Sequence, residues 1–211
     1  MQNQIYYANH AKMLLNPLVE GELRFGKVNS TGFECLLQKK GEKLSGWLSY
    51  TFARAIMNAK NDKISTIANR PHDFSIGTSY QPSKRCFLQA QWKYLSGKPI
   101  TTPTGFYEYQ GQMVPIYSTM FNDRLPVYHR LDITAQFRLN KKVDGRWSHM
   151  LSVSVQNVYA RKNPISVTFN KTTEDSKYII PADVLHKSEY ISTILYAGTI
   201  MPTITYAITC K

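Results

Sequence analysis

Charged side chains that alternate with apolar ones are the residues of this sequence best placed to do chemistry. Arg130, Asp132 and Arg138 occupy polar positions of one segment, and the positions between them are apolar. A two-residue spacing puts such side chains on one face of a β-strand. Asp73 and Lys93 occupy equivalent polar positions in two earlier alternating segments. Paired charges on a polar face can hold a polar partner or line a path for a solute, whereas a solvated face with weak ion pairs is the simpler alternative.

A second candidate site is a cluster of aromatic residues in a long loop between Ser96 and Val127. The cluster consists of Phe106, Tyr107, Tyr109 and Tyr117. Long loops carry binding residues more often than the elements they connect, so these side chains are candidates for contact with a ligand. Packing of the loop on its own aromatic side chains is the equally open alternative.

The sequence gives little support for a metal site or a catalytic site. His72 and His129 each open a predicted strand and would lie roughly 10 Å apart with one strand between them, but no third ligand is spaced to join them. The three cysteines are far apart and form no Cys-x-x-Cys pair. No nucleophile elbow, zinc-protease motif or phosphate-binding glycine loop occurs. We therefore expect no catalytic residues, metal or cofactor, and a protein that is not an enzyme.

The charge of the chain indicates an anionic partner. The net charge is +12 and the isoelectric point is near 9.6. Nucleic acid and the phosphates of outer-leaflet lipopolysaccharide would both suit this charge. The lysines are scattered among acidic residues of the predicted loops and do not form the basic stripe of a nucleic-acid interface. The sequence thus favours lipopolysaccharide and predicts no nucleic-acid binding.

The elements that position these residues are strands, most clearly between Asn122 and Pro164. Two alternating segments there are joined at Lys141–Arg146, which contains the turn dipeptide Asp144-Gly145. Their apolar positions are Leu131, Ile133, Ala135, Phe137 and Leu139 in the first segment, and Trp147, Leu151, Val153, Val155 and Tyr159 in the second. Each segment spans about ten or more residues, which is close to the length a tilted strand needs to cross a bilayer.

The order of the connections points in the same direction. Short turns at Lys40–Glu42, Gln81–Lys84 and Asn140–Arg146 alternate with long loops at Ala8–Ser30, Ile56–Pro71 and Ser96–Val127. Short connections on one side and long ones on the other are typical of outer-membrane barrels. The sequence predicts an all-β fold, an antiparallel transmembrane β-barrel segment with about seven spanning strands in a single partial domain over residues 1–211. An open edge cannot face lipid, so such a segment needs strands from elsewhere.

If the chain crosses a membrane, we expect it to do so with β-strands alone. No run of about 18 apolar residues suggests a transmembrane helix. Residues Met1–His10 contain no basic region followed by an apolar core, so no export signal is recognised. An exported barrel without a signal would be an incomplete chain, and this is the expectation here.

Five segments in order carry a resemblance to a known family. They are Gly46–Thr51, Arg70–Asp73, Ser96–Pro99, Arg124–Asp132 and Asn157–Pro164. Through them the chain resembles, from roughly Ile5 to Ile208, the C-terminal barrel portion of TonB-dependent outer-membrane receptors. The likeness is to the subgroup whose plug is preceded by a carboxypeptidase-regulatory-like domain.

The resemblance implies a barrel of about 22 strands in the cell outer membrane, filled by an N-terminal plug. It implies uptake of a scarce ligand, with energy relayed through TonB, which would reach this chain only through the missing plug. The implied partners are outer-membrane lipid, lipopolysaccharide, the plug and the missing N-terminal strands. Transport by this chain alone is not expected.

Two structural interpretations follow. In a barrel, Asp73, Lys93, Arg130, Asp132 and Arg138 would face the lumen, and Tyr128 and Tyr159 would belong to the outer aromatic girdle. The alternative is a soluble β-barrel or sandwich that binds a small apolar ligand or a polyanion, in which the apolar stripes would face inward.

Overall fold

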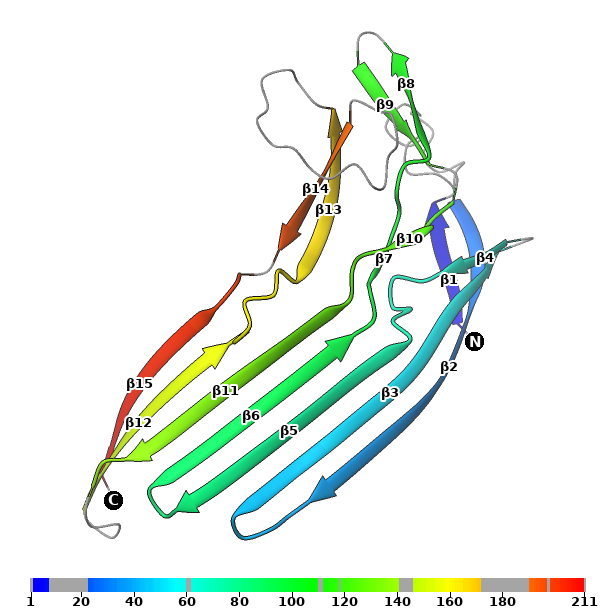
Figure 1. Ribbon diagram of the computed structural model, residues 1–211. Helices are drawn as coiled ribbons and strands as arrows, with labels where there is room; N and C mark the ends of the chain where they lie inside the picture. Colours follow the sequence, from blue (N-terminus) through cyan, green and yellow to red (C-terminus); the bar gives the residue numbers. More distant parts are fainter. Residues whose placement is uncertain are drawn as a thin grey trace.

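The computed structural model (Figure 1) describes residues 2–7, 23–59, 62–109, 112–117, 119–140, 146–171, 190–196 and 198–210. Every regular element in these ranges is a β-strand, and no helix in them is long and apolar enough to cross a membrane. The fold is therefore all-β and antiparallel, as the alternation of the sequence predicts.

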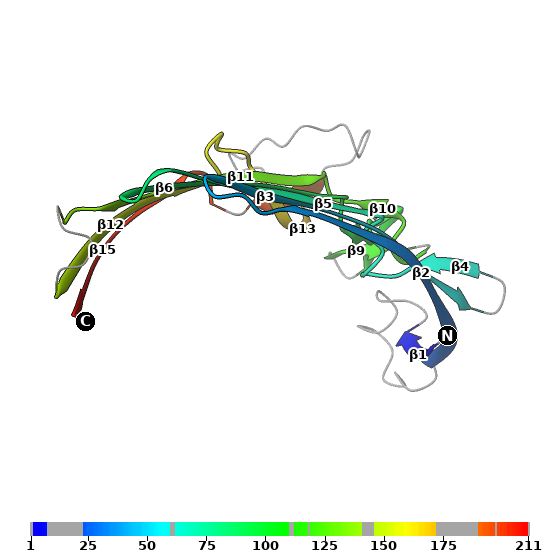
Figure 2. The ribbon, with the colours of Figure 1, turned by 90° about the horizontal axis from the view of Figure 1, so that it is seen from below.

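One antiparallel sheet contains most of the described residues, and its strands follow the order β1-β2-β3-β5-β6-β11-β12-β15. The bounds are β1 Gln2–Tyr7, β2 Leu23–Lys39, β3 Leu44–Ala59, β5 His72–Ser83, β6 Cys86–Leu95, β11 Tyr128–Arg138, β12 Trp147–Gln156 and β15 Met201–Cys210. Seven of these strands are 10 to 17 residues long, in agreement with the predicted number. Figure 2 shows the sheet as an arc, and its edge strands β1 and β15 do not pair with each other among the described residues.

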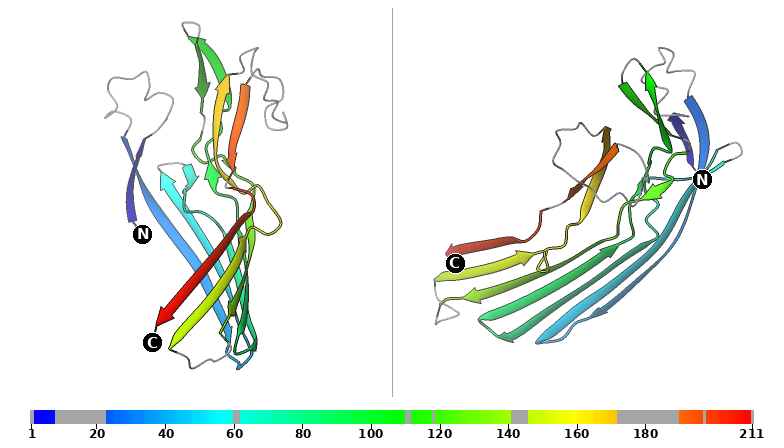
Figure 3. Two further views of the ribbon diagram at one scale, coloured as in Figure 1. Left: turned by 90° about the vertical axis from the view of Figure 1, so that its left-hand side faces the viewer. Right: turned by 45° about the horizontal axis from the view of Figure 1, so that its top comes forward.

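The two ends of the sheet differ, and we call them the turn rim and the loop rim. At the turn rim, β2–β3, β5–β6 and β11–β12 are joined by short connections (Figure 1). At the loop rim the longer connections contain β4 Asp62–Ser65, β7 Pro99–Ile100, β8 Gly105–Tyr109, β9 Gln112–Ile116, β10 Asp123–Arg124, β13 Pro164–Lys171 and β14 Tyr190–Tyr196. The β8–β9 and β13–β14 hairpins stand beyond this rim (Figure 3).

The strands extend further toward the loop rim than the sequence predicts. Residues 23–30 belong to β2 and residues 56–59 belong to β3, although both ranges were expected to be loops. Lys27 pairs with Asn58 and Asn29 pairs with Ile56, so the ladder continues where the apolar alternation has ended. Backbone pairing does not require an apolar face, and this is why the pattern missed it. The predicted Asp144-Gly145 turn lies outside the described residues.

Cross-strand register gives the sheet one apolar face and one polar face. Leu37, Leu48, Ile76, Trp92 and Leu131 form one row across five strands. The next row consists of Gln38, Trp47, Gly77, Gln91 and Asp132 and lies on the opposite face. The apolar face is open, since the exposed fractions of Leu37 and Ile204 are 62% and 74%.

The deepest burial lies at or near the loop rim, where Met57 and Ala59 at the end of β3 are 3% and 4% exposed, and Ser75 of β5 is buried on the polar face. Leu125 is buried at the loop rim, together with the polar residues Thr66, Asn69, Ser96, Asn157 and Asn163. Buried polar groups are stable only when they are hydrogen-bonded. The loop rim is therefore held by polar contacts, which directs attention to that end of the molecule.

Candidate functional site at the loop rim

The five predicted charged residues share the polar face, and the structure joins four of them in pairs. Lys93 Nζ lies 3.8 Å from Asp73 Oδ2, and Arg130 Nη2 lies 2.8 Å from Asp132 Oδ2. Both pairs lie in the half of the sheet nearer the loop rim. Arg138 lies at the turn-rim end of β11, apart from the other four. The parity argument is thus confirmed for the shared face, whereas a role in a lumen stays a prediction.

The polar face is hollowed beside these pairs. A cavity of about 260 Å³ is lined by Gln89, Gln91, Asp132, Thr134 and Gln156 among others. Its polar side chains come from three adjacent strands, so a partner seated there would meet amide, hydroxyl and carboxylate groups. These groups suit a polar surface and not a small apolar ligand.

The predicted aromatic cluster falls on the β8–β9 hairpin and the residue that follows it. Phe106, Tyr107 and Tyr109 lie in β8, and Tyr117 comes directly after β9. The side chains of the first three lie outside the described residues, and contact of these four residues with a ligand stays a prediction. Tyr117 is half-buried, and burial raises the pKa of its phenol.

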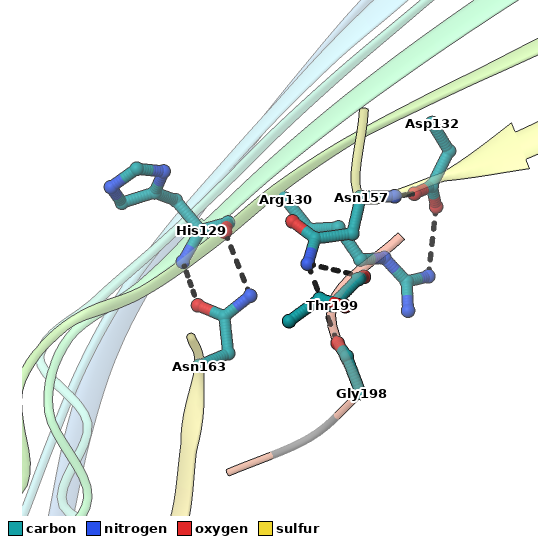
Figure 4. Close-up of polar contacts among 7 residues, drawn as sticks. All are labelled: His129, Arg130, Asp132, Asn157, Asn163, Gly198 and Thr199. Carbon is teal, nitrogen blue, oxygen red and sulfur yellow. Dashed lines mark hydrogen bonds and ion pairs between the residues drawn. The ribbon is translucent and has the colours of Figure 1, made fainter. Parts of the chain in front are cut away.

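One polar cluster fixes the position where β12 leaves the sheet (Figure 4). We call it the asparagine corner and define it as His129, Asp132, Asn157, Asn163 and Thr199. Asn157 is only 1% exposed and has a positive φ of 56°. Its backbone N–H donates to Asp132 Oδ1 at 2.9 Å, and its Nδ2 donates to Thr199 O at 2.7 Å. Asn157 therefore ties the end of β12 to β11 through its backbone N–H, and to the entry of β15 through its side chain.

Asn163 acts in the same corner as a substitute for a missing strand partner. Its Oδ1 accepts from His129 N at 3.1 Å, and its Nδ2 donates to His129 O at 3.0 Å. An amide side chain that meets both backbone groups of one residue reproduces a strand pairing. Asn163 thus satisfies the backbone N–H and C=O groups of His129, which lies beyond the residues of β11 that pair with β12. It also holds the start of β13 against the sheet.

A second polar cluster joins three connections at the loop rim. We call it the arginine junction and define it as Asn69, Arg70, Ser96, Gly97 and Arg124. Arg124 Nη1 donates to Asn69 O at 2.7 Å and to Gly97 O at 3.0 Å. Arg70 Nε donates to Ser96 O at 3.0 Å. The two guanidinium groups thus bind consecutive carbonyl groups.

The junction is tightly packed around its glycine. A Cβ atom at Gly97 would lie 1.9 Å from Leu125 O, so no other residue fits there without moving the backbone. Ser96 exchanges hydrogen bonds with His72, from its N–H to His72 O and from His72 N to its Oγ. Burial lowers the pKa of Arg70, while the charges of Asp73 and Tyr128 oppose this effect.

Aromatic and histidine rings form a band along the apolar face near the loop rim. Ring contacts at 5.4 to 6.4 Å between centroids connect two groups, Tyr50, Phe52 and His72 in the first, and Phe74, Trp92, Tyr94, His129 and Tyr159 in the second. Tyr159 belongs to this band as predicted. The placement of Tyr128 there was wrong, because Tyr128 pairs with Leu95 in the row of Asp73 on the polar face. His129 takes that place on the apolar face.

The histidines of this band have hydrogen-bond partners. Tyr50 Oη lies 2.9 Å from His72 Nδ1, and Tyr159 Oη lies 2.7 Å from His129 Nδ1. In the part of the chain that the structure describes, no group of three or more potential metal ligands occurs. Both histidines are therefore hydrogen-bonded to tyrosine hydroxyl groups.

A second, smaller set of rings lies near the turn rim on the same face. His149 stacks on Tyr206 at 6.0 Å, and its Nδ1 lies 2.7 Å from Tyr206 Oη. Trp147 and Tyr80 lie at the turn-rim ends of their strands, and both are exposed. Between the two sets of rings the apolar face is mainly aliphatic.

Comparisons of this chain with protein-family models, with curated proteins and with solved structures find no match. The family resemblance therefore stays a prediction, and function has to be argued from the geometry of the sheet and of the loop rim.

The residues that organise the loop rim were not singled out by the sequence. Asn157, Asn163, Arg70 and Arg124 lie within the motif segments, but their individual roles depend on contacts across 26 to 55 positions of sequence. One usable signal is the end of the alternation at Gln156, since an asparagine that follows a long strand often takes a positive φ.

Proposed function

We propose that this chain forms part of the wall of a bacterial outer-membrane β-barrel, as the C-terminal barrel portion of a TonB-dependent receptor that takes up a scarce ligand. The observation that carries this proposal is the apolar face. It is uncovered, aliphatic at its centre and bounded by aromatic rings at both rims. That arrangement is typical of the lipid-facing side of outer-membrane barrels.

The dimensions of the apolar face support the proposal. His129 and Phe137 are eight residues apart on β11, which corresponds to roughly 26 Å along the strand. A strand tilt of about 40° reduces this to roughly 20 Å along the membrane normal. An apolar band of about 25 Å is usual in outer-membrane barrels, so the rings at the two rims would lie near the two interfaces.

The open edge at β15 supports additional strands as partners. Among the described residues β15 pairs with β12 alone, all ten of its residues are exposed, and none is charged; its one proline, Pro202, lies at the loop-rim end, so residues 203–210 contain neither charge nor proline. Free strand edges are normally protected by charges, by proline or by a covering element. In the proposed barrel, this edge pairs with strands outside the chain, the polar face meets a plug, and the basic loops meet lipopolysaccharide phosphates.

Site-directed labelling tests the orientation of the wall. The chain is expressed with an export signal, its native cysteines are replaced by serine, and single cysteines are introduced at Leu131, Val153 or Ile204. Ser154→Cys and Thr205→Cys are the matched controls, since both positions lie next to a test position and on the polar face. We expect a bilayer-confined thiol reagent to label the first set and to spare the controls.

A stable, soluble and monomeric product in which none of the three sites reacts with the bilayer reagent would refute the proposal. Such a result would favour the soluble alternative, in which the apolar face turns inward. That alternative requires a covering layer, and the described residues contain none over this face.

A further inference from the structure

In the arginine junction, Arg70 and Arg124 bind the consecutive carbonyl groups of Ser96 and Gly97, and neither guanidinium group forms an ion pair with a described carboxylate. Among the described residues, no Asp or Glu oxygen lies within 4 Å of a nitrogen of Arg70 or Arg124. The acidic residues nearby are engaged elsewhere. Asp73 pairs with Lys93, and Asp123 accepts a hydrogen bond from the backbone N–H of Arg124. Arg70, Arg124 and Lys93 together exceed the two carboxylates by one positive charge.

Both guanidinium groups are fixed in position and retain free donors. Each guanidinium has five N–H groups. In the contacts described, Arg70 uses its Nε–H, and Arg124 uses its Nη1 atom. The carbonyl groups that hold them belong to packed segments, so their orientation is set before any ligand arrives. Preorganised donors bind an anion with a smaller loss of side-chain entropy.

The junction faces the polar side of the sheet. Asp73 and Tyr128 are close enough to Arg70 to raise its pKa. Asp73 and Tyr128 both pair with Leu95, in one cross-strand row on the polar face. Arg161 adds a third guanidinium along the rim, where its Nη2 donates to Val127 O at 3.0 Å. A ligand that approaches the polar face from the loop rim would pass this positive edge first.

From this geometry we infer that Arg70 and Arg124 form an oxyanion-binding site at the loop rim, which takes a carboxylate or phosphate group of a ligand. Guanidinium groups match both groups with paired N–H donors. The site needs only the described junction, so it does not rest on the proposed membrane location.

The test titrates the full chain, refolded in zwitterionic detergent micelles, with inorganic phosphate or with citrate at constant ionic strength. Proton–nitrogen NMR follows the arginine Nε–H resonances, which R70K, R124K and R146K assign by loss of one signal each. We expect saturable shifts at Arg70 and Arg124 and none at Arg146, which is exposed near the turn rim. Tighter citrate binding identifies a carboxylate ligand, and tighter phosphate binding identifies a phosphorylated one.

The lysine variants keep the net charge and lose the planar donor set, so the dissociation constant of the tighter anion should rise at least about tenfold in R70K and R124K. R146K should leave it unchanged. The inference is overturned when neither anion gives saturable shifts in the unaltered chain, or when Arg146 responds with the same affinity as Arg70 and Arg124. The first readout uses the unaltered protein, so misfolding of a variant does not affect it.

Discussion

At the residue scale, Asn157 combines a backbone requirement and a side-chain requirement in one position. Its positive φ of 56° suits Asn or Gly, and its buried side-chain amide binds two later segments of the chain, at Arg161 and at Thr199. Nδ2 donates to Arg161 O at 2.9 Å and to Thr199 O at 2.7 Å, while Oδ1 accepts from Arg161 N at 3.2 Å. Gly would keep the backbone conformation and lose all three bonds.

Asn157→Asp separates these two requirements. It keeps the size and the acceptor, but it removes the donors and places a charge against two carbonyl oxygens. We expect the free energy of unfolding to fall by on the order of 3 kcal/mol, because buried acceptors lose their partners. Urea unfolding of the full chain in detergent micelles, followed by tryptophan fluorescence, measures the change.

Asn122→Asp is the matched control. Asn122 makes similar contacts, with Nδ2 donating to Thr102 O at 3.0 Å and Oδ1 accepting from Thr102 N at 2.8 Å, but it is exposed. Water can replace a lost bond there, so a change below about 1 kcal/mol is expected. Equal losses at the two positions would show that burial of Asn157 is not the cause.

At the element scale, Trp47 of β3 and Gly77 of β5 form a complementary pair on the polar face. Trp47 lies opposite Gly77, and a Cβ atom at Gly77 would lie 2.5 Å from Trp47 Nε1. The indole therefore covers the glycine backbone, which compensates for the missing side chain. This contact requires a large ring on one strand and no Cβ on the next.

Gly77→Ala should displace the indole and destabilise the sheet by about 1 to 3 kcal/mol. In a Trp47→Ala background the same change should have little effect, so a double-mutant cycle should give a coupling energy of at least about 1 kcal/mol. Gly105→Ala is the control, since among the described atoms its Cβ would meet Ile116 Cδ1 at 3.8 Å, an ordinary contact distance. Additive effects of the Gly77 and Trp47 substitutions would contradict direct contact between them.

The sequence predicted the faces of the strands because alternation is a local property. The alternating residues from Leu131 to Phe137, and Val153, lie on the faces that their residue types predict. Cross-strand register brings these faces into line and does not change them. The contacts at the loop rim were harder to predict from the sequence. Tyr128 lies on the polar face because its position in the alternation of β11, and not its aromatic type, sets the direction of its side chain. Asn157 meets Thr199 across 42 positions of sequence, and no pattern in a single strand reports such a contact.

At the scale of the whole molecule, the sheet has rigid connections and open edges. The asparagine corner and the arginine junction fix the long connections at one rim. By contrast, within the described part of the chain the backbone of β15 pairs with β12 alone, and residues 29–39 of β2 pair with β3 alone. Stability should therefore be highest in the central strands and lowest along the outer edges. This gradient would change once other strands paired with the edges.

Hydrogen exchange of the full chain in micelles should resolve this difference. In an antiparallel strand, successive amides point to opposite neighbours, so alternate amides of β15 should exchange slowly and the others quickly. Residues 133–137 of β11 serve as the internal control, because β6 and β12 pair with them on both sides, and all their amides should be protected. Uniform protection along β15 would mean that another segment or a second copy covers this edge in the isolated chain. The alternating pattern would instead leave β15 available for the partner strands that the proposed barrel requires.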